Sequence, residues 1–209
     1  MQFDLFDETE NKILDAKTYA EFKSALVASQ CTKCALSESR RHIVVDRGNP
    51  EANVLMIGEG PGENEDIQGR AFVGRAGQLL DEMLKELGFD TNRDSLITNV
   101  VKCRPPENRA PKQEEADTCL PFLKKQIALI KPKFILLLGA VALRHIVKDK
   151  KQFSMEQEAG TFFVHPDFPG VRFMVLFHPA YILRDPRKKP LMREHLKRFK
   201  EAFDQGRDG

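Results

Sequence analysis

Four cysteines are the first residues of this chain whose types and spacing could do chemistry. Cys31 and Cys34 form a C-x-x-C pair, and Cys103 and Cys119 lie far from it in the sequence. In an intracellular chain thiols stay reduced, so a set of four with one close pair indicates a metal centre rather than disulfides. Zinc and an iron–sulfur cluster are both bound by four thiolates.

The spacing of the second pair favours one of these metals. Fifteen residues separate Cys103 from Cys119, unlike the C-x-x-C of a zinc ribbon. A [4Fe–4S] cluster is therefore the favoured interpretation, and a redox-active C-x-x-C is the weaker one. Four unrelated buried thiols are a third alternative, because free cysteine is commonly a core residue.

A glycine-rich, acidic loop at residues 58–66, with the sequence GEGPGENED, is the second candidate site. Gly58 and Gly60 allow the backbone to turn sharply and to approach a ligand. Glu59 and Glu65 place carboxylates in the same loop. Because the loop follows an apolar run, and ligands of open α/β sheets bind at the carboxyl ends of strands, we interpret it as an active-site loop.

Two further polar residues occur at predicted strand ends. Asn99 interrupts an apolar strand, and His178 follows another and begins a proline-containing loop. A lone Asn often makes only local hydrogen bonds, and a lone His is more often structural than catalytic. Their positions favour a role beside the acidic loop, since three loops would then meet at one crevice.

The elements that must position these residues alternate between strand and helix. Short apolar runs predict strands buried on both faces, and segments with helical spacing lie between them. This order predicts a three-layer α/β/α sandwich around a central, mostly parallel four-stranded sheet. The predicted strands are residues 54–57, 96–101, 134–138 and 173–177. The predicted helices are residues 10–29, 76–87, 113–130, 140–147 and 191–203, with a loop or short hairpin at 154–171.

Composition sets the broader class. The chain has 209 residues, of which 41% are hydrophobic, which suffices for one globular domain over residues 10–205. Neither a secretory signal nor a stretch long enough to span a membrane is recognised, so we expect a soluble, cytoplasmic monomer. The net charge is +2, but residues 184–200 are strongly basic, which indicates either phosphate contact or a solvated helix face.

Residues 1–9 are predicted to be a flexible tail. Within them, Gln2, Leu5 and Phe6 resemble the short peptides, with Gln first and Leu-Phe last, by which bacterial repair proteins bind the sliding clamp. Two apolar anchors on a free terminus could supply most of the energy of such an interaction. The alternative is a frayed terminus that folds back on the body.

Four motifs together resemble the iron–sulfur, family 4 uracil-DNA glycosylases. They are GEGPGxxED at residues 58–66, GxxFVGxAG at 69–77, TNVVKCRPP at 98–106 and HPAYxLR at 178–184. With the four cysteines they occur in the family's order. The resemblance implies the family's fold, a [4Fe–4S] cluster, and an enzyme that flips uracil out of DNA and hydrolyses its glycosidic bond.

The resemblance also implies the roles of the residues that hold uracil. Phe72 would stack on the base, and Asn99 would bond to O4 and N3–H, a pattern that cytosine reverses. His178 would donate to O2 as charge builds on the leaving base. Glu65 would lie near C5 and exclude the methyl group of thymine. Backbone N–H groups near Gly60 and Phe72 could share in stabilising the charge.

Water activation and DNA contact are implied less directly. The best-known uracil-DNA glycosylases carry an Asp where this chain has Gly60, so Glu59 becomes the candidate for orienting water or stabilising the oxocarbenium-like sugar. Tyr181, Ile182 and Leu183 are candidates for the wedge that fills the space left by the flipped nucleotide, and Leu183 is the first choice among them. Phosphate contacts are expected from Arg184 and the basic residues after it, and from Lys102, Arg104 and Arg109.

Two other functions would fit parts of the pattern. A related group binds uracil-DNA covalently through a histidine in a basic loop, but residues 104–119 contain no histidine. A nucleotide-binding Rossmann-like domain is the other alternative, although GEGPG is not G-x-G-x-x-G and the neighbouring carboxylates would repel phosphate.

Overall fold

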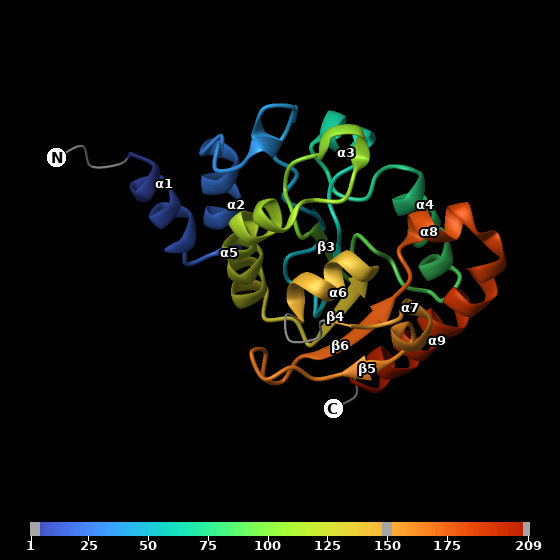
Figure 1. Ribbon diagram of the computed structural model, residues 1–209. Coiled ribbons are helices and arrows are strands. Elements are labelled where there is room, and N and C mark those ends of the chain that lie inside the picture. Colours follow the sequence, from blue (N-terminus) through green and yellow to red (C-terminus); the bar gives the residue numbers. More distant parts are fainter. Residues whose placement is uncertain (1–4, 148–151, 207–209) are drawn as a thin grey trace.

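The computed structural model describes residues 5–147 and 152–206, and its centre is one mixed β-sheet (Figure 1). The strand order is β1-β3-β2-β4-β6-β5. The four predicted strands are present and parallel to one another. They are β2 (Val54–Gly58), β3 (Leu96–Asn99), β4 (Phe134–Leu138) and β6 (Arg172–Leu176).

The sheet has six strands, not the predicted four. β1 (Arg47–Gly48) pairs antiparallel with β3, and β5 (Phe162–Phe163) pairs antiparallel with β6. Two residues are too few to show an apolar run or an alternation, so these edge strands exist only through pairing with a longer neighbour. β5 does lie within the segment predicted as a loop or short hairpin.

Two layers of helices cover the sheet, which confirms the α/β class and the sandwich. α4 (Arg75–Lys85) and α9 (Lys189–Gln205) lie on one face, and α5 (Gln113–Ile130) and α6 (Ala140–Ile146) on the other (Figure 1). Alternate strand residues divide between the faces: Met56 packs in the α4–α9 core and Leu55 in the α5–α6 core. This period of two is why each strand is apolar throughout.

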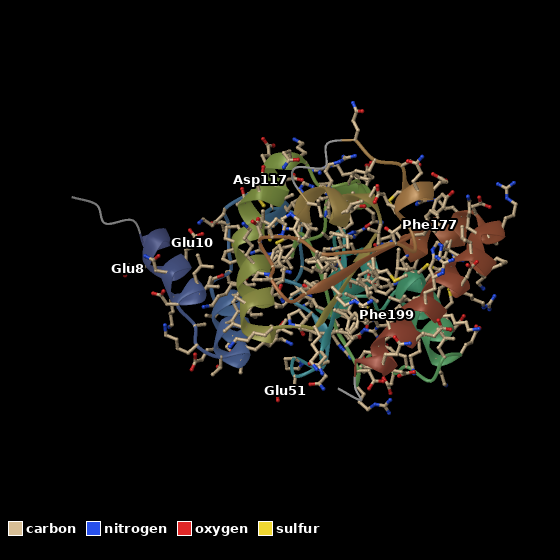
Figure 2. The ribbon with its side chains drawn as sticks, turned by 90° about the horizontal axis from the view of Figure 1, so that it is seen from below. Glu8, Glu10, Glu51, Asp117, Phe177 and Phe199 are labelled. Carbon is tan, nitrogen blue, oxygen red and sulfur yellow. The ribbon has the colours of Figure 1, made fainter. Side chains whose placement is uncertain are left out.

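Aromatic rings fill the core beneath α9. Phe199 of α9 is fully buried, and its ring lies 5.6 Å from that of Phe89 and 5.9 Å from that of Phe134 (Figure 2). Edge-to-face contacts of this kind add to the free energy gained from burying the rings. They anchor the last helix, whose preceding segment carries His178.

The amino-terminal helices form an outer layer on α5. α1 (Leu5–Leu14) and α2 (Tyr19–Ala28) replace the single helix predicted for residues 10–29. The break lies at Thr18, whose hydroxyl oxygen accepts from the N–H of Glu21 while the carboxylate of Glu21 accepts from the N–H of Thr18. This capping box starts a new helix where spacing alone suggested continuity.

Part of the predicted tail, residues 5–9, is helical. α1 begins at Leu5, so residues 5–9 belong to a helix that extends from the body (Figure 1). An ion pair between Glu10 and Lys33 links α1 to the segment after α2. Of the three clamp-peptide residues, Gln2 lies outside the described residues.

Several short helices lie in segments that the sequence analysis treated as loops. Each has at most six residues, which is too few to show helical periodicity. They are α3 (Glu63–Gln68), α7 (Met155–Glu158) and α8 (Pro179–Arg184), with 3-10 turns at Ala35–Ser37, Pro106–Asn108 and Pro186–Lys188. Within residues 5–147 and 152–206, the helices are all too short or too polar to cross a membrane.

Candidate active site

The carboxyl ends of three parallel strands meet at a pocket of about 470 Å³. Gly58 at the end of β2 is directly opposite Asn99 at the end of β3, and His178 follows β6. Predicted site residues from all four motifs line the pocket together: Glu59, Gly60, Glu65, Phe72, Asn99, His178 and Arg184. The sheet therefore brings together side chains that are up to 125 positions apart in the sequence, from Glu59 to Arg184 (184 − 59).

Phe72 is held in an unusual backbone conformation at the pocket wall. Its φ angle is +53°, and its side chain is 5% exposed. A Cβ on Gly58 would lie 2.5 Å from the ring, and a Cβ on Gly77 would lie 1.8 Å from the Phe72 carbonyl oxygen. Both glycines are therefore needed for Phe72 to reach this place, and the ring presents an apolar surface to the pocket.

The Asn99 side chain is the chemically most distinctive group in the pocket. The residue is 1% exposed, and neither Oδ1 nor Nδ2 has a hydrogen-bond partner among the described residues. Leaving buried polar atoms unpaired costs on the order of 1–3 kcal/mol. An amide kept in this state beside an aromatic ring is prepared for a ligand with one donor and one acceptor in a plane.

His178 is fixed in one tautomer by its own helix. Its Nδ1 accepts a hydrogen bond of 3.1 Å from the N–H of Ala180, which caps α8. Burial, together with the positive charge of Arg184, lowers the pKa of His178 to about 4. The ring is therefore neutral near pH 7, with its proton on Nε2, and it lies 5.8 Å from the Phe72 ring. A neutral donor is thus available in the pocket.

Glu59 and Arg184 form the charged part of the pocket. Burial raises the pKa of Glu59, and the nearby guanidinium of Arg184 partly opposes this shift. A carboxyl group with a raised pKa in a cleft is typical of acid–base or electrostatic chemistry. Gly60 follows Glu59 in the pocket lining, and a Cβ at this position would lie 2.9 Å from the Val101 side chain.

Two other carboxylates of the loop, those of Glu65 and Asp66, hold the backbone. Glu65 is 9% exposed, and its Oε1 accepts a hydrogen bond of 2.6 Å from the N–H of Gly74. Asp66 accepts from the N–H groups of Arg41 and His42, at 2.8 and 3.3 Å, and so caps a neighbouring loop. α3 is thereby tied both to the segment of Phe72 and to the segment that follows the cysteine pair.

One wall of the pocket was not assigned from the sequence. Pro105, Asn108, Arg109 and Ala110 line it, and Asn108 has a φ of +56°. Arg109 had been considered only for DNA contact. Its guanidinium donates to both carboxylate oxygens of Glu115, at 2.8 and 2.7 Å. The prolines around this loop restrict its backbone, and they were the one feature of the sequence that indicated a fixed loop conformation.

From the sequence, Lys102 is expected to contact a DNA phosphate, but the structure buries its side chain. It is 1% exposed, and its Nζ bonds to Thr98 Oγ1 at 2.6 Å and to the Asn99 carbonyl oxygen at 2.7 Å. Burial lowers its pKa to about 8. Arg104 is half-buried and lies 3.6 Å from Glu63.

α8 divides the predicted DNA-binding residues between core and surface. Ile182 is 1% exposed and belongs to the α4–α9 core, so it is not available as a wedge. Tyr181 packs with its ring 5.5 Å from that of Phe177 (Figure 2). Leu183 is 36% exposed, and Arg184 lies at the mouth of the pocket.

The basic segment after Arg184 is partly paired with carboxylates of the same chain. Five of its cations form ion pairs, so these charges are partly offset within the protein, and phosphate contact by this segment stays a prediction. The pairs are Arg187–Asp185, Lys188–Glu156, Arg193–Glu86, Arg198–Glu194 and Lys200–Asp204.

All four cysteines line one small apolar cavity between α2, α5 and the segment after β3. Arg40 joins them, since its Nη1 donates to the carbonyl oxygen of Cys31 at 2.6 Å and lies 3.4 Å from Cys103 Sγ. Burial raises the pKa of Cys103 to about 12 and that of Cys119 to about 11, and neighbouring thiols add to both shifts. Among the described residues, no three His, Cys, Asp or Glu side chains are arranged to hold a metal ion.

Comparison with known proteins identifies the family. The family model of the uracil DNA glycosylase superfamily matches residues 45–204. The chain belongs to this superfamily. The matched region contains every pocket residue named above, and the resemblance drawn from the four motifs is thereby confirmed.

Curated type-4 uracil-DNA glycosylases align with most of this superfamily member. A type-4 uracil-DNA glycosylase of Thermotoga maritima is 46% identical over 158 residues, which are 75% of this chain and 79% of the relative. Type-4 uracil-DNA glycosylases of Saccharolobus solfataricus and Sulfurisphaera tokodaii are 38% and 40% identical, over 83% and 82% of this chain and 82% and 79% of theirs. Family membership leaves no support for the Rossmann-like alternative.

Proposed function

We propose that this uracil-DNA glycosylase superfamily member is a monofunctional enzyme that hydrolyses the N-glycosidic bond of uracil in DNA and leaves an abasic site for base excision repair. The observation that carries the proposal is the buried, unpartnered amide of Asn99 beside the Phe72 ring and the neutral His178. This set matches a flat base with adjacent donor and acceptor groups.

Uracil satisfies the Asn99 amide and cytosine does not. Nδ2 would donate to O4, and Oδ1 would accept from N3–H, with the base stacked on Phe72. Cytosine carries an amino group at C4 and no proton on N3, so both atoms of the amide would face a group of their own kind. Glu65 at the far wall would exclude the 5-methyl group of thymine.

His178 would stabilise the departing base. Its Nε2–H would donate to O2 as negative charge develops there, and one donor placed in this way contributes about 10²–10³ in rate. Donors in backbone N–H groups near Gly60 and Phe72 would assist. A neutral imidazole suits this role, because it donates without first having to gain a proton.

Glu59 would act on the sugar side of the bond. The glycosidic carbon becomes positively charged as the bond breaks, and a water must then attack it. A carboxylate in a partly buried loop can stabilise that charge and orient the water. The raised pKa of Glu59 and the opposing effect of Arg184 support a tuned carboxyl group rather than a purely solvated one.

Leu183 and Arg184 would contact the DNA around the flipped nucleotide. Leu183 is the exposed apolar residue of α8, so it is the residue we assign to the wedge. Arg184 beside the pocket would bind a flanking phosphate. Tyr181, which packs on Phe177, would support the wedge from below.

The four cysteines would hold a [4Fe–4S] cluster. Their convergence on one apolar cavity supports this, and a cluster requires its thiolates to be farther apart than a single ion does. The cluster would supply a structural cross-link between the segment of Cys31 and Cys34 and that of Cys103 and Cys119. The protein purified without oxygen is expected to be brown, with about four irons and four sulfides per chain; a colourless protein with one zinc would contradict this.

The test of the proposed function is excision from oligonucleotides with one uracil, opposite guanine, opposite adenine or unpaired, with thymine and cytosine as controls. Alkali-sensitive abasic sites are expected at uracil alone. They should be lost or strongly reduced in His178→Ala and Asn99→Ala and retained in His165→Ala, whose histidine lies outside the pocket. A denaturation-resistant adduct with uncut DNA would instead support the covalent binder. If neither abasic sites nor an adduct is found, both functions are refuted.

The proposed cellular setting is the cytoplasm, where a monomer would work on DNA and could attach to the sliding clamp. Replacing Gln2, Leu5 and Phe6 with alanine together is expected to abolish clamp binding while uracil excision stays unchanged. Unchanged clamp binding would refute the clamp proposal alone.

A further inference from the structure

Lys102 connects the cysteine segment to the residue that would read the base. It lies between Asn99 and Cys103 and is buried. Its ammonium group bonds to the Asn99 carbonyl oxygen at 2.7 Å, and its backbone N–H lies against the Cys119 thiol. Its backbone carbonyl oxygen accepts from the N–H of Val44 at 2.8 Å. One residue therefore contacts both sites.

The acceptors of the Lys102 ammonium are neutral. They are the carbonyl oxygen of Asn99 and the hydroxyl oxygen of Thr98, which itself donates to the Val45 carbonyl oxygen at 2.7 Å. None of the described carboxylates forms an ion pair with this lysine. The carboxylate of Asp46 favours the charge of this ammonium without bonding to it, but burying an ammonium whose hydrogen-bond acceptors are all neutral is still costly. An apolar side chain of similar length would fill the same space. Filling the core does not explain the choice of lysine.

The hydrogen bond of Lys102 completes the anchoring of one peptide unit. In the peptide that joins Asn99 to Val100, the carbonyl oxygen accepts from Lys102 Nζ, and the N–H donates to the Gly58 carbonyl oxygen at 3.0 Å. Both polar groups of this peptide are thus held. None of the described residues bonds to the amide of the Asn99 side chain, so its direction depends on this backbone anchor and on packing against Gly58 and Phe72.

We propose that Lys102 is a positioning residue, whose ammonium fixes the peptide after Asn99 and thereby aims the Asn99 amide at the edge of uracil. This inference rests on the proposed function. A misplacement of about 1 Å at a reacting site can cost about a hundredfold in rate. The four-carbon side chain of Lys102 reaches from its position next to Cys103 back to β3. The position of the cysteine segment would therefore also determine where the ammonium group lies.

The test is a double-mutant cycle between Lys102→Met and Asn99→Ala, read as the single-turnover rate of uracil excision. Lys102→Met is expected to lower the rate of the wild-type enzyme by about ten- to a hundredfold. In the Asn99→Ala background the same change is expected to lower it by less than about twofold, because the residue being aimed is already gone. Equal losses in both backgrounds would overturn the inference.

Two further variants separate positioning from stability. Lys102→Gln keeps a donor for the Asn99 carbonyl oxygen and is expected to restore part of the rate, which a purely electrostatic or space-filling role would not predict. If Lys102→Met does not fold, the cycle is run with Lys102→Gln, and additive losses again overturn the inference. Lys85→Met, on the exposed side of α4, is the matched control for loss of a lysine.

Melting temperature and the visible absorbance of the cluster are measured on each variant. A rate loss with both unchanged is the expected result, and a loss that merely follows melting temperature or cluster content would overturn the inference. A wild-type enzyme that does not excise uracil would refute the proposed function as well. An active wild type with an additive cycle would refute the role of Lys102 alone.

Discussion

Two groups of buried polar side chains, one around Asp46 and one around Asn99, differ in one respect. Around Asp46, the carboxylate accepts from Tyr19 at 2.6 Å and from Lys23 at 2.8 Å, and Gln126 donates to the Tyr19 hydroxyl at 2.9 Å. In the pocket, both polar atoms of Asn99 lack a partner among the described residues. The first group is complete within the protein, and the second is not.

The difference indicates which group serves stability and which serves binding. A network whose members are all hydrogen-bonded stabilises the fold and holds α2 against α5. An unpaired amide destabilises the folded state, and its cost is recovered when a ligand provides the missing partners. The aromatic and histidine neighbours of Asn99 then specify the shape of that ligand. The predictions below test this contrast.

A large effect is expected from a single methyl group behind Phe72. In Gly58→Ala the new Cβ would lie 2.5 Å from both the Phe72 ring and Asn99 Oδ1, so the base-binding side chains must move. Excision should fall about a hundredfold in single-turnover assays. Gly206→Ala is the matched control, since its Cβ would meet nothing closer than 3.5 Å. Near-normal activity in Gly58→Ala would show that the tight packing is not required.

The contrast itself is tested by removing one member of each group. Asp46→Ala should lower the free energy of unfolding by about 1–3 kcal/mol, because Tyr19 and Lys23 lose their acceptor, with excision per folded molecule retained. Asn99→Ala should do the reverse, with excision lost and stability in denaturant titrations unchanged or slightly increased. Equal destabilisation by both would mean that Asn99 has protein partners after all.

A smaller effect is expected on the salt dependence of DNA binding. Arg184→Ala should reduce the slope of log K against log salt concentration by about one, as expected for one lost phosphate contact. Arg193→Ala should leave the slope unchanged, because Arg193 is already paired with Glu86 at 2.8 Å. Titrations of uracil-free duplex at several salt concentrations would measure both. A change for Arg193 as large as that for Arg184 would support the basic helix as a DNA surface.

The smallest effect concerns His178, which is expected not to titrate near neutral pH. Because the pKa of His178 is lowered to about 4, its imidazole should stay neutral and protonated on Nε2 from pH 8 to about pH 5. Nitrogen chemical shifts of the ring would show this directly. The folded state takes up this proton less readily than the unfolded state, so His178 favours folding above its ordinary pKa of 6.5, and this contribution is lost as pH falls toward 4. A titration near 6.5 in the folded enzyme would contradict the tautomer assigned here.

Much of the architecture and the pocket follows from local pattern. The apolar runs at β2, β3, β4 and β6 are buried on both faces, as runs without alternation require. Three motifs follow strands that are parallel, so their side chains had to meet at one edge of the sheet. The family motifs alone therefore indicate that Asn99 and His178 are site residues.

Other features depend on contacts that no local pattern records. The pairing of Arg193 with Glu86 joins residues 107 positions apart, and it offsets one charge of the basic segment. The wedge assignment turned on the orientation of α8, which buries Ile182 and exposes Leu183.

The strands and the order of the motifs were thus set by the sequence alone, because hydrophobic runs and turn residues act over a few neighbouring positions. Which charges are paired, which apolar residue faces solvent and which buried amide lacks a partner were decided only by the tertiary structure. Each of these depends on what another part of the chain places within a few ångströms. The role proposed for Lys102 belongs to the second kind, since a lysine three positions after Asn99 acquires meaning only once both are buried.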